Sequence, residues 1–169
     1  INAGILPLTF KNAKDYVYIT TPYLIITDEM KRELCLAAKR GVDVRIITPG
    51  IPDKKIVYKV TRSYYAPLAK AGVRIYEFKE GFFHAKQWVS DDEVAVVGTV
   101  NMDYRSLIHH YECGVMLIGA GCIKDIKADF DNMFDKCMDM CDFRQSTPVA
   151  LLCRICSRSH LTSNTETNL

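Results

Sequence analysis

Apolar β-prone runs alternate with helix-prone stretches along the first half of the chain, and this alternation restricts the fold more than any other feature. Residues 16–20, 42–48 and 73–78 are rich in β-branched and aromatic side chains, which favour strands. Between them, residues 29–40 and 53–71 place apolar side chains at helical spacing. Asp28 is the expected N-cap of the first helix, and Gly41 and Gly72 are typical of helix C-termini.

The second half is predicted to add three strands and a helix. Residues 82–90, 94–99 and 111–118 are the predicted strands, with Asp91 and Asp92 forming a tight turn, and residues 122–140 are the predicted helix. The whole pattern predicts an α/β/α sandwich, in which a mixed β-sheet is flanked by helices on both faces. We expect one domain over residues 1–141 and a C-terminal extension over 142–169. The extension ends in a polar segment expected to be frayed.

Size and charge narrow the classes of protein. A chain of 169 residues with 49% hydrophobic and 25% charged residues has ordinary globular composition, which argues against disorder, collagen and coiled coils. Its formal net charge of +2 is far from that of a dedicated nucleic-acid-binding protein. The sequence has no apolar run of 18 or more residues, the length expected of a transmembrane helix.

Seven cysteines, an odd number, indicate a reduced protein rather than a disulfide scaffold. Four of them, Cys137, Cys141, Cys153 and Cys156, have a spacing that loosely resembles a zinc site. The alternative interpretation places Cys137 and Cys141 one turn apart on the buried face of a helix. We favour the second, because the region lacks the glycine-rich turns of zinc ribbons.

Polar side chains gather between residues 84 and 112 in a pattern suited to phosphate chemistry. His84 and Lys86 are two positions apart, so on a regular strand they share a face. A hairpin would bring Thr99 and Asn101 beside them. A lysine supplies charge for a phosphate, threonine and asparagine supply hydrogen-bond donors, and histidine supplies a nucleophilic nitrogen. Glu112 lies on a later strand and could orient the imidazole.

The full spacing, His84-x-Lys86-x4-Asp91-x6-Gly98-Thr99-x-Asn101, resembles the signature of the phospholipase D superfamily. Further stretches resemble the second catalytic half of bacterial cardiolipin synthases, over roughly residues 16–140. They are TPY at 21–23, AAKRGVDVRI at 37–46, RSYY at 62–65, AGV at 71–73 and GTVNMDYRS at 98–106. The resemblance implies transfer of a phosphatidyl group from one phosphatidylglycerol to another, giving cardiolipin and glycerol. It implies neither metal nor cofactor.

The same resemblance implies a function for each motif residue. His84 would be the nucleophile or the general acid of a reaction that passes through a phosphohistidine. Lys86 and Asn101 would be catalytic with it and, together with Thr99, would hold the phosphate oxygens.

Glu112 would be the carboxylate that fixes a catalytic imidazole, whereas Asp91 and Gly98 would be structural. His110 departs from the family pattern, which has Asn-Phe-Glu where this chain has His110-Tyr111-Glu112. An apolar groove using Phe82, Phe83 and Trp88 would admit acyl chains, unless these aromatics belong to the core.

The family uses two such motifs and this chain has one, because no other histidine is followed two residues later by lysine. The chain is therefore interpreted as half of a longer synthase, whose other part would hold the first motif and the anchor in the bacterial membrane. The start at Ile1 favours this view, and the fragment itself is expected to be soluble and membrane-peripheral.

The alternative is a homodimeric single-motif phosphodiesterase or nuclease, to which the net charge gives little support. A third possibility is a module that binds anionic lipid without catalysis. The expected partners are phosphatidylglycerol or another anionic phospholipid and a second half carrying the motif, with nucleic acid disfavoured.

Overall fold

A computed structural model describes residues 5–140 of the chain. Its helices are α1 (Ile5–Asn12), α2 (Asp28–Lys39), α3 (Lys55–Ser63), α4 (Tyr65–Lys70) and α5 (Ile123–Phe134), with a short π-helical turn η1 (Arg105–His109). Its strands are β1 (Tyr16–Thr20), β2 (Leu24–Ile25), β3 (Asp43–Pro49), β4 (Arg74–Phe78), β5 (Gln87–Ser90), β6 (Val94–Gly98), β7 (Met102–Asp103), β8 (Gly114–Ile118) and β9 (Cys137–Asp139).

Seven of these strands form one mixed sheet in the order β8-β6-β5-β1-β3-β4-β9. The central strands β1, β3 and β4 run parallel, whereas β5, β6, β8 and β9 join by antiparallel pairs. A separate parallel pair, β2 and β7, lies beyond the ends of β1 and β6. The predicted mixed sheet with flanking helices is confirmed.

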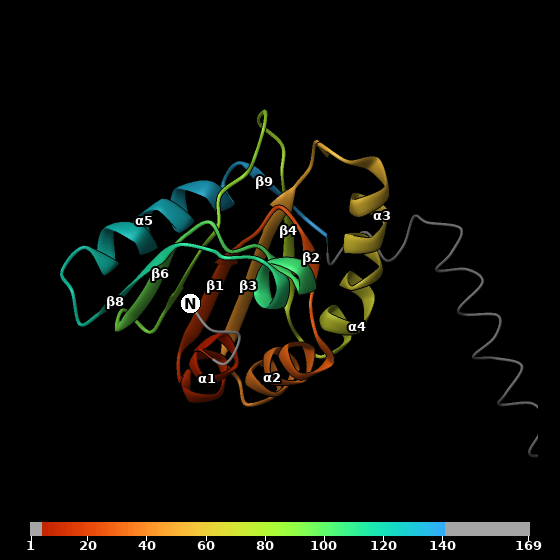
Figure 1. The fold of residues 1–169 in the computed structure, drawn as a ribbon. Helices are drawn as coiled ribbons and strands as arrows, with labels where there is room; N and C mark the ends of the chain where they lie inside the picture. The colour runs from red at the N-terminus through yellow and green to blue at the C-terminus, as the bar shows by residue number, and fades with distance from the viewer. Residues whose placement is uncertain (1–4, 141–169) are drawn as a thin grey trace, which may run out of the picture.

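Figure 1 shows helices on both faces of the sheet. Two apolar clusters hold them there. On one face, Leu6 and Phe10 of α1 pack with Leu34 of α2 and Leu68 of α4, all fully buried. On the other face, α5 contributes a second cluster that includes Phe130. The sandwich is therefore asymmetric, with several helices on one side and a single long helix on the other.

Local differences from the sequence prediction have physical causes. The predicted helix over 53–71 breaks between α3 and α4, because Pro67 has no N–H and its ring would clash with the carbonyl of Ser63 in a continuous helix. Thr27, and not Asp28, caps α2, its side chain accepting a hydrogen bond from the Met30 N–H at 3.2 Å. Helix α1, the short strands β2 and β7 and the turn η1 were not predicted.

The end of the described chain also differs. The predicted helix over 122–140 stops at Phe134. Strand β9 then pairs with β4 and forms the edge of the sheet, with Cys137 opposite Phe78. The expectation that Cys137 and Cys141 lie one helical turn apart is therefore wrong, because Cys137 is in a strand. Cys141, Cys153 and Cys156 lie outside the described residues. Burial raises the pKa of the Cys137 thiol to about 12, so the thiol is protonated at neutral pH.

Candidate active site

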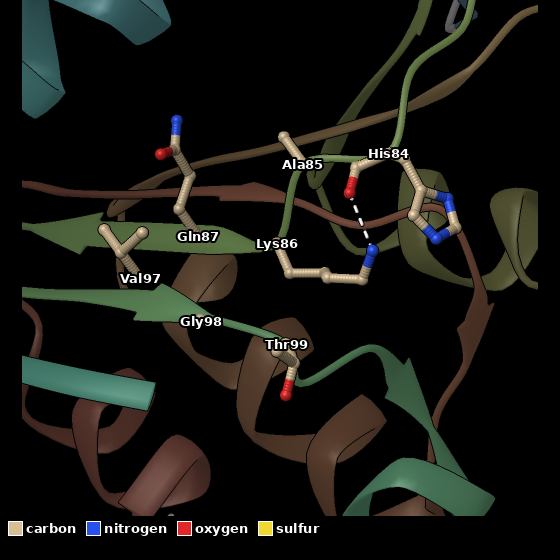
Figure 2. A pocket seen from close by; sticks show the side chains of 7 residues that line it. All are labelled: His84, Ala85, Lys86, Gln87, Val97, Gly98 and Thr99. Carbon is tan, nitrogen blue, oxygen red and sulfur yellow. Dashed lines mark hydrogen bonds between the residues drawn. The ribbon is translucent and has the colours of Figure 1, made fainter. Parts of the chain in front are cut away.

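Four of the motif residues, His84, Lys86, Gly98 and Thr99, meet at one end of the strands, where β1 and β3 end and β5 begins. A cavity of about 350 Å³ opens there (Figure 2). It is lined by His84, Ala85, Lys86, Gln87, Val97, Gly98 and Thr99. The carboxyl ends of parallel strands are the usual position for a binding site in an α/β fold, since the loops that follow them are free to carry functional side chains.

His84 lies in a segment without regular secondary structure before β5, because the predicted strand over 82–90 is reduced to Gln87–Ser90. The exposed imidazole stacks on Phe82, with ring centroids 5.4 Å apart, and meets Tyr23 edge-on at 6.1 Å. Within residues 5–140, neither ring nitrogen has a hydrogen-bond partner. Both nitrogens therefore remain available to a substrate or to a residue from elsewhere.

Lys86 is held beside the histidine by the main chain. Its Nζ donates to the carbonyl oxygen of His84 at 2.7 Å, and Figure 2 shows its side chain passing between His84 and Thr99. Desolvation, followed by the positive charges of Lys86 and Lys54, lowers the pKa of His84, while Asp53 opposes that shift. Partial burial likewise lowers the pKa of Lys86 against the opposing charges of Glu112 and Asp53. The site thus favours a neutral imidazole beside a cation.

Gly98 is required by the close approach of β6 to β8. A Cβ atom at this position would lie 2.6 Å from Gly114 Cα and would also overlap the carbonyl oxygen of Cys113. The following residue, Thr99, accepts a hydrogen bond from the Cys113 N–H at 3.0 Å and donates its hydroxyl proton to Glu112. The absence of a side chain at Gly98 therefore sets the position of Thr99.

Asn101 is half-buried and does not line the cavity. Its Nδ2 donates to Ser106 Oγ at 3.0 Å, and its Oδ1 is buried without a partner in the described part of the chain. A half-turn of the amide would let Ser106 donate to Oδ1 and would free Nδ2 as a donor. A buried polar atom without a hydrogen-bond partner is uncommon in folded proteins, so this amide has hydrogen-bonding capacity left for a ligand.

Glu112 does not contact His84 among the described residues, and the predicted contact between the two is not formed within this chain. The Glu112 side chain is 12% exposed, and it accepts the Thr99 hydroxyl proton and faces His110 Nδ1 at 3.8 Å. His110 in turn accepts a hydrogen bond at Nε2 from Arg105 Nε at 2.8 Å. Since Nε2 accepts, the ring proton of a neutral His110 lies on Nδ1, toward the carboxylate.

Asp91 lies at the opposite end of β5 from Lys86, in a turn where its φ is 54°. Its carboxylate accepts hydrogen bonds from the N–H groups of Lys14, Asp15 and Tyr16 at 2.9–3.0 Å. Asp91 therefore ties the start of β1 to the hairpin and takes no part in the cavity.

Three residues near His84 were not predicted from the sequence. Tyr23 follows β1, and its hydroxyl donates to Asp53 Oδ2 at 2.5 Å, while Lys54 Nζ lies 5.7 Å from the centre of the Tyr23 ring. Thr21-Pro22-Tyr23 had marked the family resemblance without indicating this function.

Phe83 and Trp88 are buried in the core, so the predicted apolar groove reduces to Phe82, which is 71% exposed.

Solved structures share this fold. Nuc from Salmonella typhimurium, a phospholipase D family member, matches with a TM-score of 0.69 over 80% of this chain and 88% of that chain, at 16% identity. A phosphatidylserine synthase from Haemophilus influenzae Rd KW20 matches with a TM-score of 0.65 over 98% of this chain and 44% of that chain, at 13% identity. The class of protein is therefore one with a phospholipase D fold.

The family is narrower than the fold. A family model described as "Cardiolipin synthase, PLD-like domain" matches residues 8–134, and the chain belongs to this family. Cardiolipin synthase 1 of Bacillus anthracis is 41% identical over 138 residues, which are 82% of this chain and 25% of the relative. An uncharacterized protein of Streptococcus mutans is 58% identical over 118 residues, 70% of this chain and 26% of the relative. The chain spans about a quarter of the length of these curated relatives.

Proposed function

We propose that the chain is one catalytic half of a phosphatidyl transferase that makes cardiolipin and glycerol from two molecules of phosphatidylglycerol. The observation that carries this proposal is the environment of His84, which lies beside a lysine at a cavity. Its pKa is lowered, which favours the neutral imidazole, and neither ring nitrogen has a hydrogen-bond partner among the described residues. The family membership and the named cardiolipin synthases support the same reaction class.

In the first step, an imidazole nitrogen attacks the phosphorus of one phosphatidylglycerol. A nitrogen–phosphorus bond forms while the bond to the head-group glycerol breaks, and the leaving oxygen takes a proton from a general acid. In the second step, a hydroxyl of another phosphatidylglycerol gives its proton to the deprotonated general acid of the first step and attacks the phosphorus. The nitrogen–phosphorus bond breaks, which releases the imidazole and yields cardiolipin. We assign His84 to one of the two histidine functions, nucleophile or general acid.

Lys86 and Asn101 would stabilise the charge on the phosphate oxygens. Lys86 Nζ is already at the cavity, and the amide of Asn101 gains a free donor when it turns. In the structure, the Thr99 hydroxyl donates a hydrogen bond to Glu112 and holds that carboxylate in place. Once this bond breaks, the hydroxyl would donate to a phosphate oxygen instead. We propose that Glu112 orients an imidazole supplied from outside the described residues, since its carboxylate does not contact His84.

We further propose that a second half carrying its own motif completes the site and that the reaction occurs at a bacterial membrane. In the part of the chain that the structure describes, no helix is long and apolar enough to cross a bilayer. No metal or cofactor enters the proposed steps, and residues 5–140 hold no group of three or more potential metal ligands.

The test uses a chimera in which the chain replaces the matching quarter of Cardiolipin synthase 1 from Bacillus anthracis. We expect the chimera to convert phosphatidylglycerol to cardiolipin and His84→Ala to lose this activity by at least about 10³-fold. Intact-mass analysis after an acid-free quench would show a phosphatidyl adduct that His84→Ala removes if His84 is the nucleophile. A stable, folded chimera without transferase activity would overturn the proposal.

A further inference from the structure

Exposed apolar and cationic side chains gather on residues 51–60 and at Phe82, two segments that reach the His84 site. Ile51 is 54% exposed, Ile56 80%, Val60 40% and Phe82 71%, all unusually accessible for large apolar side chains. Three exposed lysines lie among the apolar residues of the 51–60 segment. We call this group the rim; its members are Ile51, Lys54, Lys55, Ile56, Lys59, Val60 and Phe82.

The rim is continuous with the catalytic histidine. Phe82 stacks on the His84 imidazole at 5.4 Å. From the other side, Lys54 lies over the ring of Tyr23, which meets His84 edge-on. Figure 1 shows the loop after β3 and the loop between β4 and β5 extending beyond the same end of the sheet. A surface that rests on the rim would therefore lie directly at the mouth of the site.

Helix α3 presents its apolar and cationic side chains outward because its inner face is firmly attached. Thr61 is 1% exposed and accepts a hydrogen bond from the Leu24 N–H at 3.2 Å, while Arg62 binds the buried Glu77. On the outward side, Ile56 and Val60 are one helical turn apart, and Lys55 and Lys59 flank them at the same spacing. Apolar residues beside lysines on one exposed face are typical of helices that lie in a membrane interface.

Charge separates the rim from the other exposed apolar surface. The segment from η1 through β8 also exposes Ile108, Val115 and Ile118, but residues 99–118 contain no lysine and a single arginine, which two carboxylates of the same segment balance. The rim carries the positive charges of Lys54, Lys55 and Lys59. The neighbouring carboxylate of Asp53 accepts a hydrogen bond from the Tyr23 hydroxyl. A cationic surface with apolar side chains matches an anionic bilayer better than a neutral protein face.

We propose that the rim is the surface by which this domain rests on an anionic phospholipid bilayer. The four apolar side chains enter the interface, the lysines bind anionic head groups, and the cavity at His84 faces the plane in which those head groups lie. This inference deepens the proposed function and rests on it for the purpose of the contact, because a lipid transferase must reach head groups in the membrane plane. Binding itself requires no turnover.

The test is co-sedimentation of the whole 169-residue chain with vesicles of phosphatidylcholine alone or mixed with phosphatidylglycerol. We expect binding to the mixed vesicles that weakens as salt is raised, and little binding to phosphatidylcholine. The double variant Lys55→Gln/Lys59→Gln should weaken binding about tenfold or more and remove the preference for phosphatidylglycerol. The double variant Ile56→Ser/Val60→Ser should also lose binding.

The matched control is Leu36→Ser/Lys39→Gln on α2, where Leu36 is 42% exposed. It removes the same types of side chain away from the site and should bind vesicles as the unaltered chain does. Unchanged thermal midpoints would show that all variants are folded. Rim variants that bind normally, or an α2 control that loses as much affinity, would overturn the proposal. If the chimera bound vesicles through the rim but had no transferase activity, the proposed function would be wrong and the proposed membrane contact would stand.

Discussion

Lys86 and Asp53 act on the imidazole of His84 with opposite sign. Desolvation and the charge of Lys86 disfavour the protonated ring, whereas the carboxylate of Asp53 favours it. The net result is a pKa below the ordinary value, so that His84 stays neutral to lower pH than a free histidine does. A neutral imidazole is the form that attacks phosphorus, so the shift widens the pH range of the reactive state.

These opposing charges predict two shifts in the pKa of His84. Lys86→Met should raise it toward the ordinary value, because a nearby positive charge is lost while the desolvation remains. Asp53→Asn should lower it further, because the charge that favours the protonated ring is removed. The measurement is an NMR titration of the imidazole C–H signals, with His84 assigned through His84→Gln. Shifts of the same sign in the two variants would contradict this electrostatic account.

Gly98 is a residue whose role is steric. Gly98→Ala should destabilise the fold by about 1–3 kcal/mol, because the added methyl group would overlap β8 at Cys113 and Gly114. The variant should also lower transferase activity in the chimera by displacing Thr99. Urea unfolding measures the first effect. Gly121→Ala is the control, since a Cβ there meets nothing within 4 Å. Equal stability of the two variants would refute the packing argument.

At the scale of elements, a buried carboxylate attaches α3 to the sheet. Glu77 on β4 is 2% exposed and binds Arg62 through Nε at 2.9 Å and through Nη2 at 3.0 Å. The hydroxyls of Tyr58 and Tyr65 donate to the same carboxylate at 3.0 and 3.1 Å. Every partner comes from α3 or from the start of α4. The network therefore fixes the helix that carries the rim.

Removing the cation from this network should cost stability. Arg62→Leu should lower the free energy of unfolding by about 2–3 kcal/mol, less than for a fully buried pair because the Arg62 side chain is 35% exposed. The control Arg32→Leu breaks the pair with Glu33, in which Arg32 is 69% exposed, and should cost no more than about 0.5 kcal/mol. Chemical denaturation of both variants decides the point: a loss at Arg62 as small as at Arg32 would show that the network contributes little.

The hairpin turn at Asp91 joins β5 and β6 to the start of β1. Asp91→Ala removes the acceptor of three N–H groups and places alanine at a φ of 54°, so it should cost about 2 kcal/mol or more. Asp91→Asn keeps one acceptor oxygen and tolerates this φ, so its loss should be smaller. Thermal unfolding distinguishes them. Loss of transferase activity in a fully stable Asp91→Ala chimera would instead give Asp91 a catalytic function.

Strands with local signals were predictable, and elements that depend on distant partners were not. Strand β1 was predicted with its observed bounds, and α2, β3, β4 and β6 were predicted with ends shifted by about one residue. The apolar residues of these elements have a spacing that indicates their buried face within the element itself. Strand β9 was missed because its residues continue a helical spacing. Its strand conformation depends on pairing with β4, which is distant in the sequence. The pair β2–β7 is too short for any local pattern.

The candidate site shows the same division. The motif spacing brought His84, Lys86 and Thr99 to one cavity, as predicted. The contact between Glu112 and His84 was not formed, because the carboxylate is engaged by Thr99 and faces His110. Tyr23 and Asp53 reach the site from the ends of other strands, and a hydrogen bond across 30 positions leaves no signal in a single sequence.

At the scale of the whole molecule, the site is open on one side. Its cavity residues come from the segment around the start of β5 and from the end of β6, and neither nitrogen of His84 has a hydrogen-bond partner within residues 5–140. A two-histidine reaction needs a second imidazole opposite the first, and the chain contains one His-x-Lys pair. Catalysis should therefore depend on what is brought to this open side.

This geometry makes the dependence of rate on chain concentration informative. We expect the chain alone to release no product from phosphatidylglycerol or from a soluble phosphodiester, at any concentration at which it remains monomeric by sedimentation. The chimera should turn over in direct proportion to its concentration, because each molecule carries both motifs. If the chain alone cleaved the soluble diester at a rate rising with the square of its concentration, two copies would be completing each other's sites, and the homodimeric phosphodiesterase would replace the synthase half as the explanation.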